Sequence, residues 1–575
     1  MIRTFTEHRI RQTRELGGQW EFITDPADRG IRDQWYAQFP AAQTNVFVPA
    51  CWNNEFGLYD YEGVAWYRTT FELASIEHIR LLFHAVLGHA DVYLDGQHLG
   101  YHYGGYTPFD FVVPSASAGK HELIVRTDST LTRQTIPIDA VDWYHYGGII
   151  RPVELQLLSG VYIDHLGIGY SLDSGNRADV TVSVRLRSLS AEEQDVPLVL
   201  SAENHVFHEE EVRVPAGQTV TVEVRQTWDD VRLWNVGRAE LYLITASTGY
   251  DDKTDRIGFR RIEVKDRQIC INGRPVYLQG VNRHDEHPEW GFAFPPKLMK
   301  KDLDLILELG CNSVRGSHYP QSPYWIDLLD EHGIVYWSEI PMWGAFLPKE
   351  VTTDPVFRQR AMRMLEEMIE RDIHHPSVVF WSIHNEIDTT CQEAIDLSVP
   401  MIERVRSMDS SRLVAYATMH PLKDVLLPLV DVIGINKYHG WYEGNVEGFQ
   451  GMLDEFHAYA EAMGAGDKPV LMTEFGAAGI YGDTGWEPRL FSEDYQAHVI
   501  REALRIFRSD AKVGGTYIWQ FADIRADLKS DRGYFRDRAR SFNNKGLLNE
   551  YRKPKQAYRV VRDIYRSAAD SPAKP

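Results

Sequence analysis

A regular alternation of short apolar runs and amphipathic segments fills the second half of the chain, from residue 263 to residue 575. The apolar runs predict buried strands, and between them Met362, Leu365 and Ile369 recur at the spacing of one helix face. Eight strand–helix units favour a parallel sheet closed into a (β/α)8 barrel over an open doubly wound sheet. The predicted strands are 275–281, 312–316, 334–339, 377–384, 413–418, 431–438, 469–474 and 515–520.

The preceding residues alternate apolar and polar side chains with a period of two, which predicts strands. The clearest examples are 180–186 and 220–225, and turn signals such as Asp95-Gly96 separate such runs. The part from Val161 to Ile262 has the size of an immunoglobulin-like sandwich, about 100 residues. The sequence therefore predicts a multidomain chain that combines all-β domains with an α/β barrel.

Composition and charge disfavour several classes of protein. The net charge is −21 and no Lys/Arg-rich run occurs, so nucleic-acid binding is not expected. The cysteines lie far apart without CxxC spacing, which indicates reduced thiols and neither a disulfide framework nor a zinc site. The first residues lack an apolar stretch of signal-peptide length, and no 18-residue apolar run follows. We therefore expect a soluble cytoplasmic protein that does not bind membranes.

Two glutamates stand where barrel enzymes place their catalytic residues, after the carboxyl ends of strands. Glu386 follows the fourth predicted strand and Glu474 ends the seventh. A single glutamate after a strand is usually a solvated loop residue, but two in one barrel predict a carboxylate pair. Such a pair cleaves glycosidic bonds: one carboxyl group protonates the leaving oxygen while the other, ionised, attacks the anomeric carbon. Their proximity separates the two pKa values.

Several motifs resemble those of glycoside hydrolase family 2. They are Asn385-Glu386 and the segments 473–476 (T-E-F-G), 280–284, 317–320 and 330–334. The resemblance covers nearly the whole chain. It implies an N-terminal jelly-roll-like, sugar-binding-like β-sandwich (1–160), an immunoglobulin-like β-sandwich (161–262) and a catalytic TIM barrel (263–575). It further implies that Glu386 is the general acid/base, that Glu474 is the nucleophile of a retaining mechanism, that Asn385 contacts the sugar 2-hydroxyl and that no cofactor is needed.

The segment after the eighth strand bears on the class of sugar. Asn543-Asn544-Lys545 is similar to the Asn-x-Lys motif of the β-glucuronidases of this family, which implies that Asn543 and Lys545 bind a sugar carboxylate. On composition alone the same residues form a common turn. An acidic protein nevertheless needs a local cation to hold an anionic sugar, and Lys545 with an amide donor suits a carboxylate.

The resemblance implicates further residues around the pocket. Asn436, Tyr438 and Tyr442 follow the sixth strand; Tyr438 would hydrogen-bond the nucleophile and Tyr442 would lie near the carboxylate. Asp142 matches an aspartate that, in this family, extends from the first domain into the active site and binds sugar hydroxyls. Trp519, at the eighth strand, resembles a tryptophan of the pocket floor. For Trp519 and Tyr438, ordinary packing at the barrel end explains the residue equally well.

Two other segments affect the interpretation. The run 284–287 (H-D-E-H) has the composition of a metal site, but it follows the first barrel strand in an irregular loop. We therefore favour a sugar-contacting or structural role for His284 and predict no metal site. Between Trp343 and Val356 the chain lacks the long insertion that some gut bacterial members carry, which predicts a more open pocket.

The leading hypothesis is a retaining, exo-acting β-glucuronidase whose substrate is a small-molecule or oligosaccharide β-glucuronide. A β-galacturonidase or a β-galactosidase of the same family is the alternative within this class. A non-catalytic carbohydrate-binding protein is a different class, for which sandwich domains and an aromatic content of 12% suffice. The presence of both Glu386 and Glu474 disfavours it. By analogy with large acidic members of the family, we expect a homo-oligomer, either a dimer or a tetramer.

Overall fold

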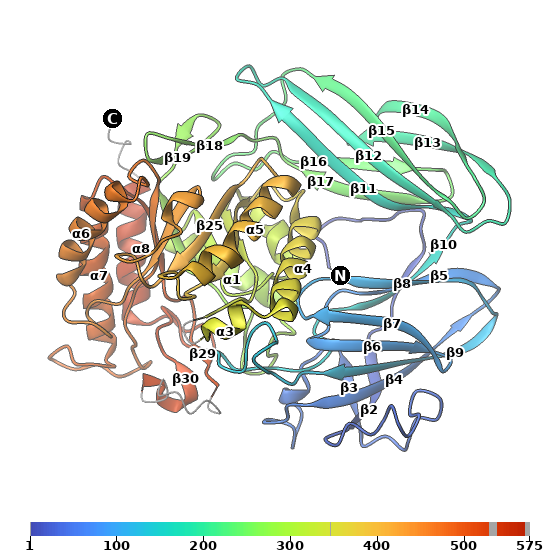
Figure 1. Ribbon diagram of the computed structural model, residues 1–575, viewed down its shortest axis with the longest axis horizontal. Coiled ribbons are helices and arrows are strands. Elements are labelled where there is room, and N and C mark those ends of the chain that lie inside the picture. Colours follow the sequence, from blue (N-terminus) through green and yellow to red (C-terminus); the bar gives the residue numbers. More distant parts are fainter. Residues whose placement is uncertain (1, 345–346, 528–536, 570–575) are drawn as a thin grey trace.

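The computed structural model describes residues 2–344, 347–527 and 537–569, and Figure 1 shows two β-sandwiches packed beside one barrel. In the first sandwich, a six-stranded and a four-stranded sheet enclose a common core that includes Ile79, Leu81 and Phe83. The larger sheet has the order β3 (Thr44–Val48), β2 (Gly18–Thr24), β4 (Val64–Leu73), β9 (Gly119–Asp128), β6 (Gly88–Leu94) and β7 (Gln97–Gly104). The smaller has the order β1 (Thr13–Glu15), β10 (Val153–Leu158), β5 (Glu77–Phe83) and β8 (Phe109–Ala116).

The second sandwich consists of a three-stranded and a four-stranded antiparallel sheet. Val180, Val182 and Val184 alternate with more exposed residues and fill its core, as the two-residue period predicts. One sheet comprises β11 (Val161–Leu172), β12 (Ala178–Ser188) and β15 (Thr219–Trp228). The other comprises β14 (His205–Val214), β13 (Gln194–Ala202), β16 (Tyr242–Ser247) and β17 (Asp252–Ile257).

The barrel is closed by eight parallel strands, which confirms the predicted fold class. The first strand begins later than predicted because Arg274 and Pro275 form β20, which pairs with β19 (Gln268–Ile271) in a small sheet with β18 (Ile262–Lys265). The barrel strands are β21 (Leu278–Asn282), β22 (Ser313–Gly316), β23 (Val335–Glu339), β24 (Val378–Asn385), β25 (Leu413–Thr418), β26 (Val432–Asn436), β27 (Val470–Glu474) and β28 (Val513–Ile518).

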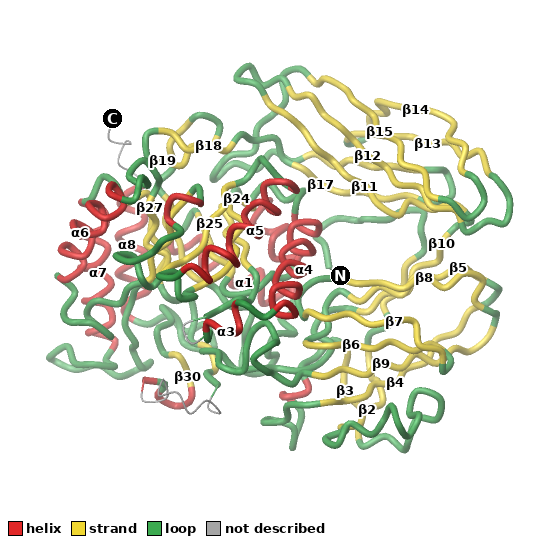
Figure 2. Tube along the Cα trace, in the orientation of Figure 1, coloured by secondary structure: helices red, strands yellow, loops and turns green. Residues whose placement is uncertain are grey.

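Helices surround the barrel strands, as Figure 2 shows in red and yellow. The helix that carries Met362, Leu365 and Ile369 begins at Pro355, because the Asp354 side chain accepts hydrogen bonds from the Val356 and Phe357 amides and caps it. The α-helices are α1 (Pro296–Leu309), α2 (Pro323–His332), α3 (Lys349–Thr352), α4 (Pro355–Asp372), α5 (Gln392–Met408), α6 (Gly448–Ala462), α7 (Glu493–Ser509) and α8 (Gln556–Ala569).

A loop of the first sandwich, residues 129–152, reaches the barrel. Its Trp143 and Tyr146 pack in one buried cluster with Phe292, Tyr319 and Trp343 of the barrel domain. The cluster fixes the neighbouring Asp142 at the carboxyl ends of the barrel strands. Among the described residues, no helix combines the length and the apolar character that crossing a membrane requires.

Candidate active site

A cavity of about 240 Å3 opens among the loops that follow the barrel strands. It contains both glutamates that the sequence singled out, and it is also lined by residues from the first-sandwich loop. The sequence-predicted residues that line it are Asp142, Glu386, Asn436, Tyr438, Tyr442, Glu474, Trp519 and Lys545. The other three, His284, Asn385 and Asn543, are buried behind this layer.

Glu474 is the last residue of β27, and its side chain is held at both oxygens. Its Oε1 accepts a 2.7 Å hydrogen bond from Arg315 Nη1, and its Oε2 accepts one of 2.7 Å from the Tyr438 hydroxyl. Arg315 is fully buried and also donates to Glu339, so its position is fixed by two carboxylates. These two hydrogen bonds fix the orientation of the Glu474 carboxyl group at the cavity.

Glu386 directly follows β24 and has a φ of 55°, in the left-handed region that side chains other than glycine rarely adopt. Its Oε1 accepts a 2.9 Å hydrogen bond from Asn436 Nδ2. Burial and, after it, the charge of Glu474 raise the pKa of Glu386 to about 8. Glu386 therefore carries a proton at neutral pH, as a general acid must.

Asn385 and Asn436 connect the two glutamates. Arg315 Nη2 and Asn436 Nδ2 both donate to Asn385 Oδ1, at 2.7 and 3.1 Å, and Thr473 Oγ1 donates to Asn436 Oδ1 at 2.7 Å. Among the described residues, the buried Asn385 Nδ2 has no hydrogen-bond partner. Because Asn385 does not line the cavity in this structure, its contact with a sugar hydroxyl stays a prediction.

Two cations converge on the Tyr442 hydroxyl at the side of the cavity. Lys545 Nζ donates to it at 2.8 Å and Arg538 Nη1 at 3.3 Å. Lys545 is only 1% exposed, and burial followed by the nearby Arg538 lowers the pKa of its ammonium well below the usual value. A substrate carboxylate placed between these donors would offset both effects.

Asp142 reaches this cation pair from the first sandwich. Arg538 donates from Nε to Asp142 Oδ1 at 2.9 Å and from Nη2 to Asp142 Oδ2, so the pair is bidentate. Asn543 Nδ2 donates to Asp142 Oδ2 at 3.2 Å. The amide of Asn543 is thus engaged with Asp142, and it does not line the cavity in this state.

Aromatic rings form one wall of the cavity. Trp519 stacks on His318 with their ring centroids 5.1 Å apart, and His284 packs edge-on behind Trp519 at 5.6 Å. Trp143 and Trp343 meet edge-to-face at 6.1 Å. His284 therefore supports the tryptophan. Of the loop after Trp343, residues 345 and 346 lie outside the described part of the chain.

Several residues of the site were not predicted from the sequence, among them Arg315, which holds Glu474, and His318, which lines the cavity. Arg315 and His318 lie at and just after the end of β22, so the strand-end rule that found the glutamates applies to them as well. Arg538 stands in an irregular segment before a short 3-10 helix (Ala539–Ser541), where nothing in the sequence marks a ligand. Trp143, Met419 and Lys437 are also part of the lining.

The described residues contain one cluster with the spacing of metal ligands, Asp327, Asp330 and His375. Its groups are already engaged: Arg3 donates to both oxygens of Asp327, and Asp330 pairs with His375 at 2.6 Å. In the H-D-E-H run, Asp285 pairs with Arg283 and Glu286 accepts from the Tyr146 hydroxyl. These contacts are those of buried ion pairs and hydrogen bonds.

Three family models match the chain in order. The sugar binding domain of family 2 glycosyl hydrolases matches residues 57–158, the family's central domain matches residues 161–260, and its TIM barrel domain matches residues 262–569.

Individual proteins are similar over nearly the full length. A β-glucuronidase of Sus scrofa is 29% identical, and the match covers 97% of this chain and 91% of that protein. A family 2 β-galacturonidase from Eisenbergiella tayi bound to galacturonate is 33% identical with a TM-score of 0.90 and covers 99% of both chains. A β-glucuronidase from Ruminococcus gnavus in complex with D-glucaro 1,5-lactone is 26% identical with a TM-score of 0.85, covering 98% of this chain and 99% of that one.

The order of the domains, the two glutamates at the ends of β24 and β27, and matches that extend over the whole chain agree with one another. The chain belongs to glycoside hydrolase family 2, and it is a glycoside hydrolase.

Proposed function

We propose that the enzyme is a retaining, exo-acting β-glucuronidase. The observation that carries the proposal is the convergence of Lys545 and Arg538 on Tyr442 in the cavity that holds Glu386 and Glu474. A buried lysine that donates to a neutral hydroxyl is costly unless a ligand supplies a negative charge. A neutral sugar supplies none, whereas the carboxylate of a uronic acid does. The β-glucuronidase relatives support the same class of substrate.

The size of the cavity supports cleavage of a single terminal sugar. Its volume of about 240 Å3 is below the roughly 300–1,000 Å3 of pockets for drug-sized ligands. The proposed substrate is therefore a small-molecule or oligosaccharide β-glucuronide whose terminal uronic acid enters the cavity. Its carboxylate faces Lys545 and Arg538, and the predicted contact of Asn385 with the sugar 2-hydroxyl is part of the proposal.

In the first chemical step, Glu474 attacks the anomeric carbon while Glu386 gives its proton to the glycosidic oxygen. The bond to the aglycone breaks and a glycosyl ester forms on Glu474. This ester carries no charge, so the repulsion that raises the pKa of Glu386 disappears and Glu386 becomes a base. In the second step Glu386 takes a proton from water, the water attacks the anomeric carbon, and Glu474 leaves. Two inversions give net retention of configuration.

A β-galacturonidase activity is the second candidate, favoured by the similarity to the Eisenbergiella tayi enzyme. Galacturonate differs from glucuronate only in the configuration at C4, so both present the carboxylate that the two cations require. Initial rates on the p-nitrophenyl β-glycosides of glucuronate, galacturonate, galactose and glucose separate the possibilities. We expect the glucuronide to have the highest kcat/KM and the neutral glycosides to be poor substrates. Equal kcat/KM values on neutral and acidic sugars contradict the proposal.

A further inference from the structure

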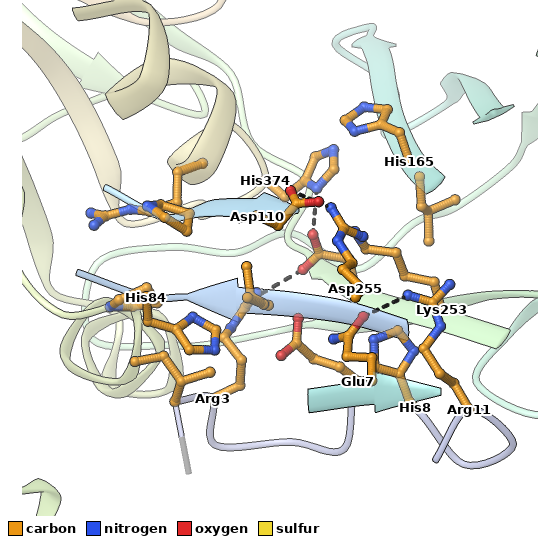
Figure 3. Close-up of a pocket in the computed structure, with 18 of the residues that line it drawn as sticks. Arg3, Glu7, His8, Arg11, His84, Asp110, His165, Lys253, Asp255 and His374 are labelled. Carbon is orange, nitrogen blue, oxygen red and sulfur yellow. Dashed lines mark hydrogen bonds and ion pairs between the residues drawn. The ribbon is translucent and has the colours of Figure 1, made fainter. Parts of the chain in front are cut away.

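A second cavity, of about 220 Å3, lies where the N-terminal segment, both sandwiches and the barrel domain meet. It shares no lining residue with the sugar cavity. Figure 3 shows the side chains that surround it: they come from residues 3–11, from β5 and β8 of the first sandwich, from β11 and β17 of the second, and from the end of α4. The chemistry of this junction is unrelated to the glycosidase reaction.

Most charged groups in the cavity wall are already paired. Asp255 accepts from His374 Nδ1 at 2.6 Å and from Arg3 Nη2 at 3.2 Å, and Asp110 accepts from Arg80 Nη2 at 2.8 Å. The Asp255 contacts join the N-terminal segment, the second sandwich and the barrel domain, whereas the Arg80–Asp110 pair lies within the first sandwich. The charges of Asp255 and Asp110 are thereby balanced, and Glu7 is a further carboxylate of the lining.

Two cationic side chains in the same wall each keep a hydrogen-bond donor that has no partner among the described residues. Within the described ranges 2–344, 347–527 and 537–569, the partly buried Lys253 forms no hydrogen bond or ion pair through its ammonium group, and the buried Arg80 Nε has no hydrogen-bond partner. Burial and then Arg80 lower the pKa of Lys253, while Glu7 acts in the opposite direction. A buried donor without a partner beside an open cavity indicates a place for a water molecule or an ion. Because both donors belong to cationic side chains that line one cavity, an anion satisfies them better than water does.

We propose that this junction cavity binds a phosphate-type oxyanion through Lys253 and Arg80. A tetrahedral oxyanion presents several acceptor oxygens and up to two negative charges, so it accepts from both groups at once. Because Arg80 belongs to the first sandwich and Lys253 to the second, the anion bridges two domains. The site exists only in the folded chain, so its occupancy stabilises the native state.

The test is thermal unfolding of the full chain in 0–20 mM potassium phosphate, with potassium chloride added to keep the ionic strength constant. We expect the Tm to rise saturably with phosphate. In Lys253→Met the apparent Kd for phosphate is expected to weaken about tenfold or more, since one charge-assisted hydrogen bond is lost. Lys120→Met, which removes an exposed lysine of β9, is the matched control and is expected to respond as the wild type does.

The control also separates binding from the general stabilisation of proteins by phosphate, because that effect does not depend on Lys253. Lys253→Arg keeps the charge and is expected to keep the response, so it serves as the test variant if Lys253→Met does not fold. Isothermal titration of the wild type with inorganic phosphate gives the affinity directly. The proposal is overturned if phosphate raises the Tm no more than chloride does at the same ionic strength. It is also overturned if the dependence of the Tm on phosphate is unchanged in Lys253→Met.

Discussion

The protonation state of Glu386 determines the pH range in which the enzyme is active. Burial and the charge of Glu474 raise the pKa of Glu386 to about 8, so the group is a carboxylic acid below that pH and a carboxylate above it. In the free enzyme we therefore expect kcat/KM for a glucuronide with a poor leaving group to fall as the pH rises through about 8. A leaving group that needs no protonation is the control, and it should show a weaker decline. A decline that begins near pH 5 contradicts the elevated pKa.

The same shift has a consequence for stability. The pKa of Glu386 in the folded state lies above that of an ordinary glutamate. Between about pH 4.5 and pH 8, Glu386 is therefore protonated more fully in the folded chain than in the unfolded chain. The contribution of Glu386 to the free energy of unfolding is therefore fully present below this window and decreases as the pH rises through it. Glu386→Gln does not titrate, and we expect its stability, measured by urea unfolding at pH 5 and pH 8, to depend less on pH than that of the wild type.

Lys545 determines preference for an acidic sugar in this account. Removing one partner of a desolvated, hydrogen-bonded charge pair costs about 2–5 kcal/mol, which corresponds to a loss of roughly 30- to several-thousand-fold. We expect Lys545→Ala to lower kcat/KM on the glucuronide by such a factor and to leave the low activity on the glucoside nearly unchanged. If the ratio of kcat/KM on the glucuronide to kcat/KM on the glucoside stays within a few-fold of wild type, Lys545 does not recognise the carboxylate.

At the scale of elements, the end of β24 places Glu386 at a positive φ. A side chain there is strained by about 1 kcal/mol, and only glycine avoids the strain. We expect Glu386→Gly to have a higher free energy of unfolding than Glu386→Ala by about this amount, measured by chemical denaturation. Both variants lose the catalytic carboxyl group, so each is the control for the other. An alanine variant as stable as the glycine variant indicates that the backbone relaxes.

The elements themselves were the most predictable part of the structure. All eight barrel strands overlap the predicted ranges because apolar runs are local signals. The ends of strands were less predictable. β26 ends at Asn436, two residues early, because the Trp441 and Tyr442 amides turn back to the Tyr438 carbonyl. The turn is local and contains Gly440 at a φ of 87°, so this glycine was an available signal for an earlier end of the strand.

At the scale of the whole molecule, the site is assembled from two domains. Asp142 comes from the first sandwich and Arg538 from the barrel domain, and they form a bidentate pair beside the sugar cavity. Sequence motifs identified Asp142 through family resemblance but gave no indication of Arg538. Which residues form a long-range ion pair depends on how the domains pack together. A local sequence pattern does not reveal that packing. For the same reason the junction cavity around Lys253 was not expected.

Asp142 should therefore matter both for activity and for stability. Asp142→Ala leaves Arg538 buried without its carboxylate, and breaking a buried pair costs about 3–5 kcal/mol. We expect a lower free energy of unfolding and a lower kcat/KM, with a smaller loss of stability in Asp142→Asn, which keeps an acceptor. Asp195→Ala removes the exposed partner of Arg213 and is the control, with an effect of about 1 kcal/mol or less. Normal kcat/KM and stability in Asp142→Ala would mean that the interdomain pair has no role.

The central claim is that Glu474 attacks the anomeric carbon of a uronide and that Glu386 assists both steps. It is tested most directly by following the hydrolysis of p-nitrophenyl β-D-glucuronide by proton NMR before mutarotation mixes the anomers. The account predicts that the first free sugar is β-glucuronic acid, since two displacements restore the configuration. An α-anomer as the first product shows that water attacks directly, and an absence of turnover shows that the cavity does not accept this sugar; either result contradicts the account.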